Sequence, residues 1–136
     1  MGRILSIVLC LLLAACGGMN DDAAAARVSV SDFRSYVSSG DHEAIYAMAD
    51  PLYKKSVTRG QHDKLFSILE KRLGDFGETT EIGWKVNYTT NGEFVVLTFN
   101  TKFENGDGAE TFTWKMTDGK ATLAGYNINS PALLAE

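Results

Sequence analysis

The sequence predicts an α+β domain in which N-terminal helices pack on a curved, four-stranded antiparallel β-meander. Residues 32–73 carry apolar side chains at helical spacing between capping residues, whereas residues 82–128 alternate apolar with polar side chains. Tight-turn sequences separate the alternating segments. Helices followed by such a meander are typical of a fold whose helices cover one face of the sheet.

The chain begins with an apolar run, residues 4–15, that follows Arg3 and contains only Ser6 as a polar residue. The run is shorter than the about 20 residues that a membrane-spanning helix needs. A basic residue, a short apolar run and small residues at its end are typical of a secretory signal. A buried helix of the mature fold is the less favoured alternative.

The run ends in Leu13, Ala14, Ala15 and Cys16, which resemble the lipobox of bacterial lipoproteins. In that family a peptidase cuts before the cysteine, which then carries a diacylglycerol thioether and an acylated amine, with fatty acids such as palmitate. The resemblance implies that residues 1–15 are a signal peptide and that Cys16 anchors the protein to a membrane, since two or more acyl chains anchor stably. Ordinary cleavage after Ala15 is the alternative. Cys10, the other cysteine, would leave with the signal.

Residues 16–27 are rich in Gly, Asn, Asp and Ala and are predicted to form a flexible tether. Ten such residues, fully extended, reach roughly 35 Å. In many Gram-negative lipoproteins an aspartate after the lipidated cysteine retains the protein in the inner membrane. Gly17 occupies that place here, so the resemblance implies the outer membrane, facing the periplasm. Residues 28–136 are predicted to form one domain.

Helix signals punctuate the first half of this domain. Ser31 is a candidate cap for a helix over 32–38 with Gly40 as its stop, and Asp41 is a candidate cap for a helix over 42–49. Asp50 and Pro51 end that helix, and residues 52–56 form a short turn.

The longest predicted helix covers residues 59–73. The spacing of Thr58 and Gln61 is that of a capping box, and Gly74 is a C-terminal stop. The helical period directs four apolar residues inward: Leu65, Phe66, Leu69 and Leu73.

Four strands follow, over residues 82–88, 94–103, 112–116 and 121–128. Asn91–Gly92 is the preferred pair for a type I′ hairpin, residues 104–108 form a loop, and Asp118–Gly119 makes another tight turn. The odd-numbered residues of 95–103 share the face toward the helices. Gly125 is a predicted bulge because the alternation shifts phase there.

Segments of both halves resemble small bacterial lipoproteins of unknown function. They are residues 39–41, 58–61, 99–105, 110–114 and 118–126, with Tyr46 and Gly74. These domains are similar to the cone-shaped, cystatin-like α+β fold of the nuclear transport factor two superfamily, which includes ketosteroid isomerases. The resemblance covers residues 31–129 and implies a fold more than a function. Ala121 stands where the family often has tryptophan, which would open space at one end of the cone.

No metal, cofactor or nucleic acid is expected. The formal net charge is −4 without a basic stripe. His42 and His62 lack the spacing of metal ligands, and each is interpreted as a solvated histidine near a helix start.

No catalytic residue is predicted. The superfamily resemblance implies a buried carboxylate and a tyrosine or protonated acid for isomerase chemistry. The polar residue on the inward phase of strand 94–103 is Thr101, however, and the acids Glu93, Glu104 and Glu110 are expected at exposed turns or strand ends with ordinary acidity.

Five residues are candidates for binding. Phe94 and Val96 are expected on the outer face of the sheet, where exposed apolar side chains indicate a protein contact, although strand propensity alone also favours them there. Tyr46, Trp114 and Tyr126 are candidates inside the cone, with simple filling of the core as the alternative.

Three functions fit these observations. The favoured one is a non-catalytic outer-membrane lipoprotein that binds a periplasmic protein or a small apolar ligand. One form of this function is an immunity protein that neutralises a secreted toxin. A small isomerase- or dehydratase-like enzyme and a structural or assembly accessory of the envelope are the alternatives. A homodimer through the sheet is a further possibility.

Overall fold

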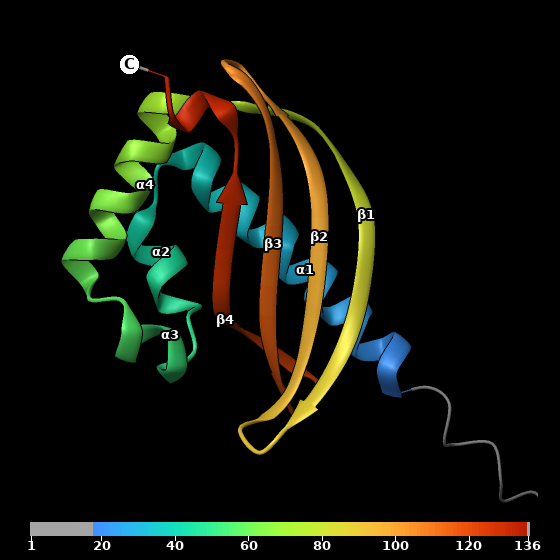
Figure 1. Cartoon of the computed structure of the whole chain (residues 1–136). Coiled ribbons are helices and arrows are strands. Elements are labelled where there is room, and N and C mark those ends of the chain that lie inside the picture. Colours follow the sequence, from blue (N-terminus) through green and yellow to red (C-terminus); the bar gives the residue numbers. More distant parts are fainter. Residues whose placement is uncertain (1–17, 136) are drawn as a thin grey trace, which may run out of the picture.

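A computed structural model describes residues 18–135. Within them, four α-helices precede four strands, which confirms the predicted α+β class. Figure 1 shows one curved sheet with α2, α3 and α4 on its hollow side and α1 running across the strands. The elements are α1 (Gly18–Ser39), α2 (His42–Ala47), α3 (Pro51–Ser56), α4 (Arg59–Leu73), β1 (Phe76–Thr89), β2 (Gly92–Phe103), β3 (Gly106–Thr117), β4 (Lys120–Asn129) and the 3₁₀ helix η1 (Pro131–Leu133).

Helix α1 begins at Gly18, so the prediction of a flexible tether over residues 16–27 is wrong for the described part of that segment. Ala23, Ala26 and Val30 recur at helical spacing and are buried. Alanine is the best helix former, and its small side chain lets a helix lie close to the sheet. The alanine-rich segment, whose composition suggested a linker, therefore forms an amphipathic helix. Ser31, predicted to cap a helix, lies inside α1 and not at its start.

Asp41 caps α2 as predicted, whereas Asp50, predicted only to end the preceding helix, also caps α3. Asp41 accepts a hydrogen bond from the N–H of Ala44, and Asp50 accepts one from the N–H of Leu52. Gly40 follows α1 with a φ of 67°, a value that favours glycine. Helix α2 ends two residues earlier than predicted, and the predicted short turn is the helix α3.

Helix α4 has the predicted bounds and the predicted capping box. Thr58 accepts the N–H of Gln61 through its hydroxyl, and Gln61 accepts the N–H of Thr58 through its side chain. Gly74 ends the helix with a φ of 71°, and a Cβ there would lie 2.8 Å from the Cβ of Glu104. Leu65, predicted to face inward, is exposed instead.

The sheet is an antiparallel meander in the order β1-β2-β3-β4. Asp118 and Gly119 both have positive φ, as a type I′ turn requires. The first hairpin turns at residues 90–91 rather than at the predicted Asn91–Gly92 pair, because Gly92 already pairs with Thr89. The predicted bulge in β4 is present, since the register with β3 shifts between Leu123 and Gly125.

The core lies between the helices and the inner face of the sheet. Val95, Leu97, Phe99 and Thr101 of β2 are buried on this face, as the odd-numbered alternation predicted. Aromatic side chains fill the space between the layers: Phe33, Phe66, Phe112, Trp114 and Tyr126. Residues 132 and 133 of the C-terminal tail pack against one end of this core.

Candidate functional site

A polar cluster lies inside the apolar layer, and α1 and each of the four strands contribute one residue to it. We call Arg34, Thr79, Thr101, Glu110 and Tyr126 the buried polar cluster; Arg34, Thr101 and Glu110 are buried, Tyr126 is partly buried, and Thr79 on the edge strand is exposed. The Arg34 guanidinium donates to the Glu110 carboxylate over 3.0 Å and to the Thr79 hydroxyl over 2.9 Å. Thr101 donates to the same Glu110 oxygen, and Tyr126 donates to the other over 2.6 Å. Both oxygens of Glu110 are therefore satisfied within the fold.

Glu110 is only 2% exposed, so the prediction of an exposed glutamate at a strand end is wrong. The strand β3 begins at Gly106, which places Glu110 inside the strand. Phe112 and Trp114 share its alternation phase and face the helices. A buried carboxylate is tolerated only when it is paired and hydrogen-bonded, and Arg34 supplies the opposite charge.

The surroundings keep the phenol of Tyr126 protonated. Burial and the negative charge of Glu110 raise the pKa of Tyr126 well above its ordinary value, so the phenol stays a hydrogen-bond donor. The Arg34 guanidinium also lies 5.2 to 5.6 Å from the ring centres of Phe76, Phe99 and Phe112. These cation–π contacts favour the charged arginine in an apolar site.

The cavity beside the buried polar cluster is small. Its volume is about 30 Å³, and apolar side chains such as Phe33, Leu69 and Phe103 line it together with Arg34 and Glu110. This volume holds about one or two water molecules. The cluster unites a carboxylate with a tyrosine, as isomerase chemistry requires, but this cavity is too small for a substrate.

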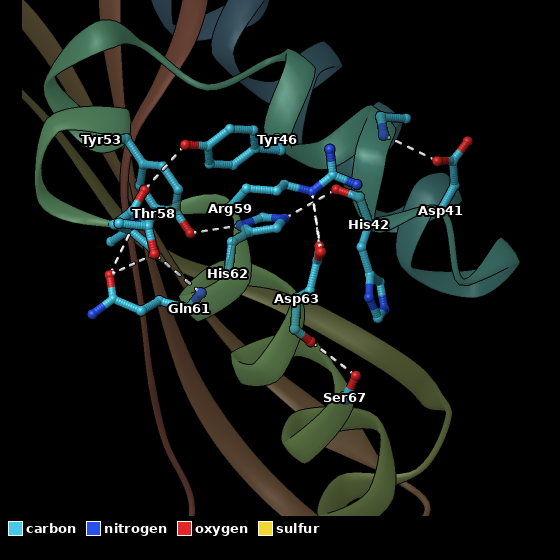
Figure 2. A network of polar contacts seen from close by, with 12 residues as sticks. Asp41, His42, Tyr46, Tyr53, Thr58, Arg59, Gln61, His62, Asp63 and Ser67 are labelled. Atoms are coloured by element: carbon cyan, nitrogen blue, oxygen red, sulfur yellow. Dashed lines mark hydrogen bonds and ion pairs between the residues drawn. The ribbon is translucent and has the colours of Figure 1, made fainter.

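A second polar network joins α2, α3 and α4 around His62 (Figure 2). His62 is fully buried, so the prediction of a solvated histidine is wrong for it. Its Nε2 lies 3.0 Å from the carbonyl oxygen of His42, which can only accept, so Nε2 carries the proton. The Tyr53 hydroxyl then donates to Nδ1 over 2.9 Å. Figure 2 shows the imidazole held between Tyr53 and the backbone of α2.

The end of this network at Arg59 and Asp63 is exposed to solvent. Arg59 pairs with Asp63 one turn along α4, and its guanidinium lies over the ring of Tyr46 at 5.6 Å. The Tyr46 hydroxyl donates to the carbonyl of Val57. Every polar atom here that faces the core has a partner within the fold, so the network ties three helices together and offers no open site.

Burial lowers the pKa of His62 below its ordinary value of 6.5. The unfolded chain therefore binds more protons than the folded chain below pH 6.5, and we expect the free energy of unfolding to fall as the pH drops from about 6.5. Urea unfolding between pH 7.5 and 5 measures this loss. His62→Gln should flatten this part of the profile, whereas His42→Gln should keep it. An unchanged slope in His62→Gln would show that other groups cause the loss.

The outer face of the sheet carries an open groove of about 410 Å³ at the end where β2 turns into β3. Residues from all four strands line it, and most of them are polar. The lining residues are Glu78, Thr80, Asn100, Thr101, Lys102, Asp107, Gly108, Ala109 and Asn129. Amide, hydroxyl and charged groups of both signs here provide donors and acceptors for a polar partner.

The five predicted binding residues do not form one site. Phe94 and Val96 are half-buried on the outer face of β2, beside Lys115 and Lys85 and toward the opposite end of the strand from the groove. Trp114 is fully buried in the core, and within the described residues its indole N–H has no hydrogen-bond partner.

The two predicted tyrosines also lie apart. Tyr46 belongs to the network around His62, and Tyr126 belongs to the buried polar cluster. Cys16, the predicted lipidation site, lies outside the described residues.

Sequence reasoning missed Arg34, Glu110 and His62. Glu110 continues the even-numbered inner phase of Phe112 and Trp114, and His62 precedes Phe66 by one helical turn. Both positions carried a usable signal.

Two further findings concern metals and membranes. Across residues 18–135, no three histidine, aspartate or glutamate side chains come together as metal ligands. No helix in this part of the chain is both long and apolar enough to cross a bilayer.

The fold and its interior define a class: a small α+β domain whose helices cover one face of an antiparallel sheet and whose core holds an ion pair. Residues 29–126 match the family described as "Protein of unknown function (DUF4019)", and the chain belongs to this family. A comparison with curated proteins finds no match to the chain.

Proposed function

We propose that this protein is a lipid-anchored, non-catalytic binding domain of the outer membrane that holds a periplasmic protein against the outer face of its sheet. The observation that carries the proposal is the groove of about 410 Å³ on that face. Its size lies in the range of about 300–1,000 Å³ that is typical of binding pockets. The lipobox-like residues that end at Cys16 supply the argument for the anchor.

The chemistry of the groove favours a protein over a small apolar ligand. Asn100, Asn129 and Thr80 present amide and hydroxyl groups that can pair with a peptide backbone or with polar side chains. Lys102 and Asp107 add one charge of each sign. The apolar cavity inside the cone, by contrast, has a volume of only about 30 Å³.

A capture experiment tests the proposal. The lipidated chain is purified from native envelopes after mild cross-linking, and the proteins that elute with it are identified. We expect one specific partner, which Asn100→Arg should abolish by filling the groove. Asn91→Arg makes the same substitution at the far hairpin turn and should retain the partner. A partner equally bound by both variants, or lipid alone, would contradict the proposal, and lipid alone would favour an envelope accessory. A secreted toxin as the partner would identify an immunity protein.

The isomerase-like enzyme is a second candidate because Glu110 lies beside Tyr126 inside the cone. Two observations weigh against it: Arg34 already neutralises Glu110, and the adjoining cavity of about 30 Å³ is too small for a substrate. Turnover of a small carbonyl compound that is lost in Glu110→Gln, with the variant still folded, would favour the enzyme.

The relationship to the nuclear transport factor two superfamily belongs to this proposal as well. The order of helices before a meander and the helix-covered hollow face support it. An experimental structure that superposed poorly on that superfamily would contradict it.

A further inference from the structure

We propose that the surface formed by Met19 of α1 and by Trp84 and Tyr88 of β1 lies on the lipid bilayer, at the level of the headgroups. We call these three residues the aromatic surface. The inference rests on the proposed lipid anchor at Cys16 and adds to it an orientation of the domain on the membrane.

The aromatic surface is unusually exposed for such large side chains. Met19 is 51% exposed, Trp84 is 43% exposed and Tyr88 is 66% exposed. Trp84, Val86 and Tyr88 follow one another at every second position, so their side chains share one face of β1. This is the face that α1 covers. They lie at the edge of the sheet, where α1 leaves them partly uncovered.

Contacts between α1 and β1 place these residues at one end of the molecule. The Arg27 guanidinium lies 5.6 Å from the ring centre of Trp84 and pairs with Glu81. Partial loss of water around the ring, and then the negative charges of Glu93 and Asp22, raise the pKa of the Tyr88 phenol, so Asp22 near the start of α1 lies close to Tyr88.

Met19 continues the same face of α1. It precedes Ala23 by one helical turn, and Ala23 is buried against the sheet. Figure 1 shows the first turns of α1 extending past β1, toward the lower end of the sheet.

The start of α1 fixes how far this end can be from the anchor. Gly18 is two residues from Cys16, and two extended residues span at most about 7 Å. A lipidated Cys16 would therefore hold the first turn of α1 at the bilayer surface. Residues 18–27 are helical, so they cannot act as the long flexible tether that was predicted over residues 16–27.

The side chains suit the membrane interface. Tryptophan and tyrosine concentrate at the level of the headgroups, since each ring combines an apolar body with a polar group. Asp22 and Glu93 place acidic charge beside Tyr88, and Arg27 is already paired with Glu81. Lys85, the neighbour of Trp84 in the chain, lies on the opposite face of the sheet. Contact therefore depends on the aromatic rings and not on attraction to anionic lipids.

The orientation leaves the proposed partner site free. The groove lies where β2 turns into β3, whereas the aromatic surface lies near the β1–β2 turn. Figure 1 shows these two turns at opposite ends of the sheet. A partner in the groove would approach from the aqueous side.

Tryptophan fluorescence tests the inference because the chain has two tryptophans in contrasting places. Trp84 is exposed, and Trp114 is fully buried in the core and serves as an internal control. The lipidated full chain is reconstituted in vesicles of phosphatidylcholine and phosphatidylethanolamine whose acyl chains are brominated near the headgroup. We expect the bromines to quench a large share of the emission and to leave Trp84→Phe unquenched. Replacing part of the lipid by phosphatidylglycerol should not increase the quenching.

Flotation of the same vesicles separates the inference from the anchor. Protein that floats with the vesicles while bromine fails to quench Trp84 would overturn the orientation and leave the anchor standing. Protein that does not float, with an unmodified Cys16 by mass, would overturn both. Shielding of Trp84 from iodide that appears only when envelope proteins are added would assign the aromatic surface to a protein contact and overturn the inference.

Discussion

Arg34→Met is expected to lower the free energy of unfolding by about 3–5 kcal/mol. The substitution keeps a long apolar stem but leaves the Glu110 carboxylate buried without a counter-charge. It also removes the donor that Thr79 shares with Glu110. Urea unfolding followed by circular dichroism measures the change. Arg72→Met, an equivalent change at an exposed position of α4, should stay within about 0.5 kcal/mol of the original chain.

A double-mutant cycle shows whether the cost comes from the uncompensated charge. Glu110→Gln replaces the carboxylate by a neutral amide, whose single oxygen can accept the hydrogen bond of either Thr101 or Tyr126 but not of both. Added to Arg34→Met, it should recover part of the lost stability because no unpaired charge remains buried. Two single-variant costs that simply add would show that Arg34 acts through its packing on the phenyl rings alone.

The helical caps and the strand alternation were predictable because they depend on short-range chemistry. The box of Thr58 and Gln61, the stop at Gly74 and the inner face of β2 need only a few neighbouring residues for their definition. These local signals agree with the global fold, and such agreement is expected of natural sequences. The fold class followed from them directly.

The buried polar cluster was harder to predict because it depends on contacts far apart in the sequence. Glu110 was expected to be exposed because it follows a glycine-rich turn, and the start of β3 was placed too late. Arg34 lies 76 residues away from Glu110. No local pattern indicates that α1 brings a guanidinium to this point of the sheet, so the pairing of Arg34 with Glu110 could be read only from the assembled fold.

Ala26→Asp is expected to destabilise the domain by more than about 3 kcal/mol, since it places an unpaired charge in the core. Ala26 is 0% exposed and lies between Ala23 and Val30 on the face of α1 that meets the sheet. The result depends on α1 being a packed helix here, because a charge on a flexible tether would cost almost nothing. Thermal and urea unfolding of the two proteins measure the difference.

Ala24→Asp is the matched control, because Ala24 lies in the same helix but is exposed. It should change stability by no more than about 0.5 kcal/mol. If α1 only detached locally in Ala26→Asp, fluorescence of Trp84 would change at low urea while the buried Trp114 stayed in its core environment. Equal stabilities for the two variants would show that residues 18–27 do not contribute to the core, and the short distance between the anchor and the aromatic surface would no longer follow.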